Sequence, residues 1–107
     1  MDIERIKFER TGGFANMRLA ADLELGDFSD EQLETLRGLL DDLDFAELPE
    51  QLMSESSASD QFTYTITVEA EKWQHTVVTG DSSADEKMQE LLELLNRQMR
   101  KKIMKKH

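Results

Sequence analysis

No arrangement of residues typical of an enzyme active site stands out in this chain of 107 residues. The absence of cysteine excludes thiol and disulfide chemistry, and two histidines, His75 and His107, are too few for a histidine-rich metal site. As a general base, His75 would need a positioned partner, and its neighbours in an alternating segment predict a surface or half-buried structural residue instead. The composition therefore argues against an enzyme that uses these groups.

Three local clusters also have simpler explanations than a reactive site. The serines of residues 54–59 lack the strand–turn–helix setting of a nucleophile and predict a polar loop. The aspartates of residues 41–44 lack the spacing and the turn glycine of a calcium loop, which favours a solvated helix end. Gly12 and Gly13 are followed by neither lysine nor a helix, so they predict a hairpin turn rather than a phosphate loop.

Four side chains in predicted loops remain as candidate binding residues. Phe14 follows the two glycines, Leu52 and Met53 lie beyond Pro49, and Asp60 ends the serine run. Each has a structural alternative of similar weight. Phe14 could close the hairpin as a core residue, Leu52 and Met53 could be buried against the sheet, and Asp60 could cap a turn.

The elements that position these loops follow from the periodicity of apolar residues. Alternation predicts four strands, at residues 4–10, 17–23, 62–68 and 73–78. Capping boxes predict helices that begin at Ser29 (with Gln32) and at Ser83 (with Glu86), each followed by a leucine-rich stripe. Gly38 inside the first helix is unfavourable by about 1 kcal/mol relative to alanine, and we interpret it as permitting close packing.

The order ββαββα predicts a single α+β domain over residues 1–107, with a basic helical tail from about residue 97. We expect a four-stranded antiparallel sheet with both helices packed on one face. Eight residues from the apolar faces should share one core: Phe8, Leu19, Leu36, Phe62, Tyr64, Ile66, Leu92 and Leu95.

This topology has a consequence for the loops. The turn at residues 11–14, the long segment 44–60 and the connection at 79–83 should gather at one end of the sheet. Irregular segments gathered on a rigid scaffold are a usual place for a binding site.

The net charge of −10 is unevenly distributed. Residues 1–96 carry seven basic and twenty-three acidic side chains, a balance of −16, and the other six basic residues lie in the tail. Such a surface repels nucleic acid and membranes and suits a protein partner with a positive rim, although solubility alone explains it equally well. The basic tail could bind nucleic acid or anionic lipid, but favourable charge at a helix C-terminus is the simpler interpretation. With no secretory or membrane-spanning pattern, we expect a cytoplasmic protein. We also expect it to be a monomer.

Several of these segments resemble one known family. The similarity begins at residues 8–15 (FERTGGFA), continues at residues 44–49 (DFAELP) and 60–64 (DQFTY), and ends in His75-Thr76-Val77 and the leucine-rich last helix. In this order the motifs resemble the emfourin-like inhibitors over nearly the whole chain. Two features depart from the family pattern: the loop before Asp60 is serine-rich, and the lysine tail is additional.

The resemblance implies a bacterial or archaeal inhibitor of protealysin-like zinc metalloproteases of the thermolysin family. Such inhibitors direct a loop aspartate at the catalytic zinc and place apolar side chains of a second loop in substrate pockets. Asp60 fits the position of that aspartate, and Gly12, Gly13, Phe14, Leu52 and Met53 form the rest of the expected protease-binding set. The protease supplies the zinc, so the resemblance implies no cofactor or metal of the chain's own.

Two other functions compete with inhibition. An acidic adaptor or regulatory module would bind a protein without blocking an active site. An acidic mimic of nucleic acid is disfavoured by the low aromatic content of 7% and by the basic tail.

Overall fold

The computed structural model describes residues 3–12, 18–52, 62–80 and 85–104. Its strands are β1 (Ile3–Gly12), β2 (Leu19–Glu24), β3 (Phe62–Ala70) and β4 (Gln74–Gly80). Its helices are α1 (Asp30–Leu43) and α2 (Glu86–Met104), with short 3-10 helices η1 (Leu25–Asp27) and η2 (Phe45–Glu47).

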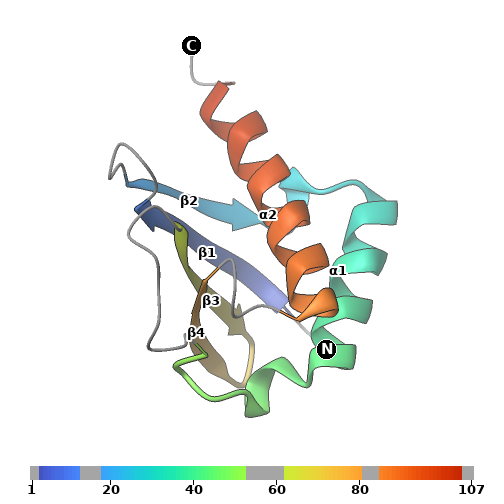
Figure 1. Ribbon diagram of the computed structural model, residues 1–107. Coiled ribbons are helices and arrows are strands. Elements are labelled where there is room, and N and C mark those ends of the chain that lie inside the picture. Colours follow the sequence, from blue (N-terminus) through green and yellow to red (C-terminus); the bar gives the residue numbers. More distant parts are fainter. Residues whose placement is uncertain (1–2, 13–17, 53–61, 81–84, 105–107) are drawn as a thin grey trace.

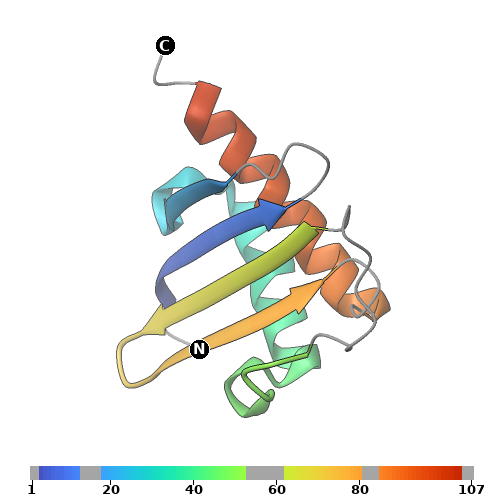
Figure 2. The ribbon, with the colours of Figure 1, turned by 60° about the vertical axis from the view of Figure 1, so that its left-hand side comes forward.

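The four strands form one antiparallel sheet in the order β2-β1-β3-β4. Both helices lie on the same face of this sheet, and the opposite face is open (Figures 1 and 2). This arrangement confirms the predicted α+β fold. Side chains alternate between the two faces of a strand, so every second residue of each strand faces the helices. Residues paired across neighbouring strands share a face, and one set of paired residues that faces the helices runs from β2 to β4: Leu23, Ile6, Val68 and His75.

The eight residues predicted to share a core do so. Six of them are buried, and Leu19 and Phe62 are partly buried and pack against the same cluster. The rings of Phe8 and Tyr64 stack at a centroid distance of 5.9 Å, joining β1 to β3. Phe45 of η2 is fully buried, so the start of the long segment is attached to this core.

The first helix begins as predicted and the second does not. The Ser29 hydroxyl accepts from the Gln32 backbone N–H, and the Gln32 side chain accepts from the Ser29 N–H, completing the capping box. At the start of α2 the Asp85 carboxylate accepts from the Met88 N–H at 2.9 Å. The N-cap is therefore Asp85, and α2 begins at Glu86, later than the predicted start at Ser83, which itself lies outside the described residues. A cap at Ser83 would accept from the Glu86 N–H, whereas the observed capping bond comes from the Met88 N–H.

The interpretation of Gly38 is also wrong. Gly38 is exposed, and a Cβ atom built there meets no heavy atom within 4 Å among the described residues. The glycine therefore does not serve close packing at this position.

Smaller differences concern the lengths of elements. The last strand begins at Gln74 rather than Trp73, since β3 continues to Ala70 and leaves a shorter turn. The basic end of α2 remains helical to Met104. Neither helix of the described residues is long and apolar enough to cross a membrane.

Candidate functional site at one end of the sheet

Three connections between elements meet the sheet at the same end. Gly12, the last residue of β1, pairs with Phe62, the first residue of β3. Thr63 then pairs with Gly80, the last residue of β4. Neighbouring strands are about 4.8 Å apart, so the three points lie within roughly 10 Å of one another. Figure 2 shows this shared end, where the arrowheads of β1 and β4 flank the start of β3.

The segment that leads into residues 53–61 is held along β4. The Val78 N–H donates to the Glu50 carbonyl, and the Leu52 N–H donates to the Val78 carbonyl, each at 2.8 Å. Gln51 and Val78 thereby form a parallel bridge. We call residues 48–52 the strap. It runs beside β4 in the same direction, so it carries the chain from η2 toward the shared end.

His75 fastens the beginning of the strap. Its Nε2 lies 2.6 Å from the Leu48 carbonyl oxygen, and its ring meets the ring of Phe45 edge-on at 5.9 Å between centroids. Since a carbonyl oxygen can only accept, Nε2 carries the proton in this contact. The half-buried His75 is thus a structural residue, as its sequence context predicted.

The residue at which the chain returns to the sheet is held from two sides. The Arg10 guanidinium lies over the Phe62 ring, 4.7 Å from its centroid, in the geometry of a cation–π contact. Arg10 Nη1 also donates to Asn96 Oδ1 of α2 at 3.3 Å. Arg10 therefore connects three elements at the shared end: β1, β3 and α2. We call this group of three residues the Arg10 clamp.

The predicted site residues fall partly within the described structure. Gly12 has a φ of 93°, which confirms the positive φ expected at the glycine turn. Leu52 is half-buried and packs against the core, so part of its side chain remains accessible. The other four predicted residues, Gly13, Phe14, Met53 and Asp60, lie outside the described residues.

The structure adds residues that the sequence analysis did not single out. Arg10 follows Ile6 and Phe8 at alternate positions of β1, so its side chain lies on the same face of the sheet. A charged residue at a position where the alternation predicts an apolar one was the feature that could have identified it. The strap had no comparable signal, because its bonds to β4 join residues that are far apart in the sequence.

An ion pair joins β1 to β3 at the other end of the sheet. At the end away from the shared one, Arg5 Nε donates to Glu69 Oε1 at 2.8 Å. This hydrogen bond and the charge of Glu69 raise the pKa of Arg5 above its ordinary value. No group of three or more histidine, aspartate or glutamate residues capable of holding a metal occurs within the described ranges.

The family comparison covers the elements that form this end of the sheet. The Emfourin family model matches residues 8–96, from the middle of β1 into α2. No curated protein and no solved structure matches the chain significantly. Since the matched residues span most of its length, the chain belongs to the Emfourin family.

Proposed function

We propose that this protein is a reversible inhibitor of protealysin-like zinc metalloproteases of the thermolysin family. The observation that carries the proposal is the family match over residues 8–96. The shared end of the sheet supports it, because this end anchors the connections that contain all the expected protease-binding residues. In this proposal the chain is a bacterial cytoplasmic protein and has no catalytic activity of its own.

In the proposed mechanism the Asp60 carboxylate binds the catalytic zinc of the protease. Hydrolysis by such an enzyme needs an open zinc position for water and substrate. A carboxylate oxygen at a normal zinc distance of about 2.0–2.2 Å would occupy this position. Inhibition would then be competitive, and the chain itself would remain uncleaved at the zinc.

Apolar residues near the same end would supply the remaining affinity. Leu52 is the last residue of the strap, and its N–H donates to the Val78 carbonyl of β4, so its backbone is already ordered before the partner arrives. Preorganised contacts lose less conformational entropy on binding than mobile ones. Phe14 and Met53 complete this set in the proposal.

The decisive test is the inhibition of a purified protealysin-like protease by the Asp60→Asn variant. Asparagine has the size of aspartate and still caps a turn, but it is a much poorer zinc ligand. We expect the inhibition constant to rise by about 10–1000-fold, equivalent to about 1.4–4 kcal/mol, with the melting temperature nearly unchanged. Asp41→Asn, which removes the same charge from the exposed end of α1, should inhibit like the parent chain.

Two results would change the proposal in different ways. If the parent chain inhibits and Asp60→Asn inhibits equally well, another acid is the ligand, and Glu55 and Asp81 are the next to be changed. If the parent chain binds the protease without slowing peptide hydrolysis, the acidic adaptor is the correct function.

A further inference from the structure

The edge of the sheet formed by β2 is a second candidate interaction surface, away from the proposed protease site. Among the described residues β2 pairs with β1 alone. The N–H and C=O groups of a strand residue point toward the same side, and successive residues alternate. The Asp22 carbonyl and the Glu24 N–H bond to side chains on the side away from β1. Ala20 lies two residues before Asp22, so its N–H and C=O groups also point away from β1.

Two side chains cover part of this edge. Lys102 Nζ of α2 donates to the Asp22 carbonyl, and Asp27 Oδ2 of η1 accepts from the Glu24 N–H at 2.9 Å. Lys102 and Asp27 also form an ion pair at 2.9 Å. We call these two residues the edge cap. They occupy two backbone groups that an added strand would need, as side chains often do on exposed edges.

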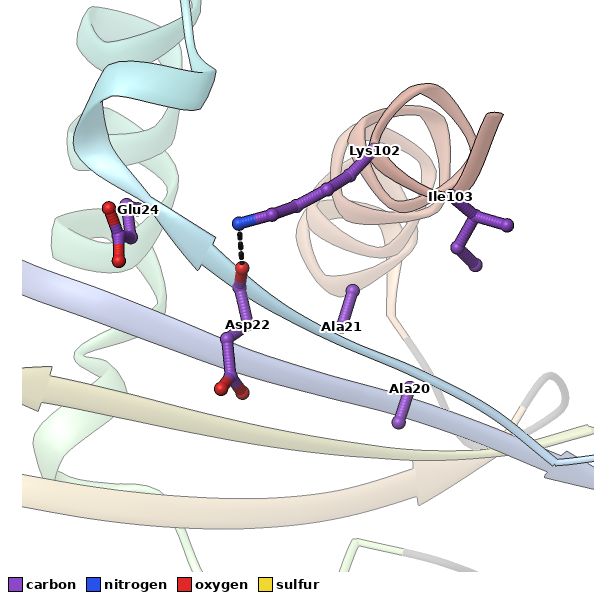
Figure 3. A pocket seen from close by; sticks show the side chains of 6 residues that line it. All are labelled: Ala20, Ala21, Asp22, Glu24, Lys102 and Ile103. Atoms are coloured by element: carbon purple, nitrogen blue, oxygen red, sulfur yellow. Dashed lines mark hydrogen bonds between the residues drawn. The ribbon is translucent and has the colours of Figure 1, made fainter. Parts of the chain in front are cut away.

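Beside the edge cap the edge is hollow. A groove of about 520 Å³ is lined by residues of β2 and by Lys102 and Ile103. Figure 3 shows the Ala21 methyl group directed toward α2, whereas the Ala20 methyl group and the Asp22 carboxylate point to the other face. Two consecutive alanines leave this part of the edge open to the backbone of another strand.

The sequence of this edge is complementary to itself. In an antiparallel pairing of two copies centred on Ala21, Arg18 of each copy lies opposite Glu24 of the other, and Leu19 lies opposite Leu23. Ala20 lies opposite Asp22, so both outward backbone groups of each residue find a partner. Opposite charges and apolar residues that face each other across strands stabilise such a pairing.

From this register we propose that the β2 edge is a surface for self-association, and that the edge cap holds it closed. The occupant is a second copy of this chain, joined through β2 into a continuous eight-stranded sheet. The cap can yield to such a partner because its two side chains are 29% and 33% exposed, and ion pairs this accessible contribute little stability. The proposal does not depend on protease inhibition.

Sedimentation velocity over a broad range of protein concentrations tests the proposal. The parent chain should be mainly monomeric. Lys102→Met and Asp27→Ala each remove one half of the cap, and each should lower the dimer dissociation constant at least tenfold. Lys101→Met removes the same charge from the adjacent exposed position of α2 and should behave like the parent. Circular dichroism would verify that each variant is folded.

A second substitution identifies the interface. Ala20→Pro removes an outward N–H while leaving the bonds to β1 intact, which edge strands tolerate. Added to Lys102→Met, it should restore the monomer, and a synthetic peptide of residues 18–24 should compete with the dimer. Variants that stay monomeric like the parent would overturn the proposal. A Lys102→Met dimer that survives Ala20→Pro would also overturn it, by placing the interface elsewhere.

Discussion

Arg10 occupies a position of β1 whose side chain faces the helices, where the pattern of Ile6 and Phe8 leads one to expect an apolar residue. A guanidinium is tolerated there because it lies on the Phe62 ring and donates to Asn96. The position is also the last inward one before Gly12. The Arg10 clamp thus restrains the points where the chain leaves β1 and enters β3, and we infer that Arg10 is a positioning residue for the adjoining loops.

Replacement of Arg10 by methionine tests this role. Methionine keeps the unbranched apolar stem but loses the hydrogen bond and the cation–π contact, which is worth about 0.5–1 kcal/mol at such a site. If the clamp positions the loops, the inhibition constant against a protealysin-like protease should rise about tenfold, equivalent to about 1.4 kcal/mol. Arg10→Lys should recover part of the affinity.

The matched control for this change is Arg5→Met, in the same strand but at the other end of the sheet. It breaks the bond to Glu69, which is an accessible ion pair, so it should change thermal stability little and leave inhibition unchanged. An unchanged inhibition constant for Arg10→Met would show that the clamp serves stability alone.

Helix α1 shows which local rules the sequence obeys and which it violates. Its capping box is complete, yet it contains Gly38 on an exposed face with no steric need for glycine. It also ends at Asp44, which has a φ of 52°, a left-handed conformation more often taken by glycine. The helix is therefore held mainly by its buried leucines, Leu36, Leu39 and Leu40.

Gly38→Ala should stabilise the protein. Alanine restricts the unfolded chain and favours the helix by about 0.5–1 kcal/mol relative to glycine. For a domain of this size that corresponds to a rise of a few degrees in melting temperature, about 4–8 °C per kcal/mol. Gly38→Ser should give a smaller gain, because serine is a weaker helix former. A loss of stability in both variants would mean that a Cβ atom is excluded from this position.

The basic end of α2 is a second element whose role the structure changes. The sequence analysis assigned its charge to the helix C-terminus, and Lys101 fits that interpretation as an exposed residue of the last turn. Lys102 instead reaches across to β2 and η1. Truncation of residues 101–107 would therefore remove the contacts of Lys102 to the sheet together with the charge at the helix end. Single substitutions of Lys101 and Lys102 separate these two roles.

At the scale of the whole molecule, one core joins the sheet to both helices. Ile66 lies at its centre, in the middle of β3, with Phe8 and Val77 beside it on the neighbouring strands. Each of these three side chains is at most 1% exposed. The same core supports the shared end and the β2 edge, so both candidate surfaces depend on it.

Ile66→Ala should lower the free energy of unfolding by about 2–5 kcal/mol, since the truncation leaves a cavity in a closely packed core. Thr65→Ala, one residue earlier on the open face, should change it by no more than about 0.5 kcal/mol. Urea denaturation of both variants measures the difference. Equal effects of the two substitutions would contradict the assignment of the faces of β3.

The sequence alone was sufficient for the order of the four strands and two α-helices, for the faces of these elements, and for eight residues of the core. These features follow from periodicity and capping, which depend on residues close together in the chain. The same reasoning placed the three connections at one end of the sheet, and the pairing of Gly12 with Phe62 and of Thr63 with Gly80 agrees with it. The same reasoning failed for the cap of α2, where Ser83 and Asp85 were both possible N-caps, and for Gly38, whose surroundings only the coordinates show.

The tertiary structure alone decided which residues hold those connections in place. Arg10 meets Asn96 across 86 positions of the sequence, His75 meets Leu48 across 27, and Lys102 meets Asp27 across 75. No period or motif encodes such contacts, because they arise only when strands and helices have packed. The residues proposed for inhibition could therefore be named from the sequence, whereas the strap, the Arg10 clamp and the edge cap became visible only in the folded chain.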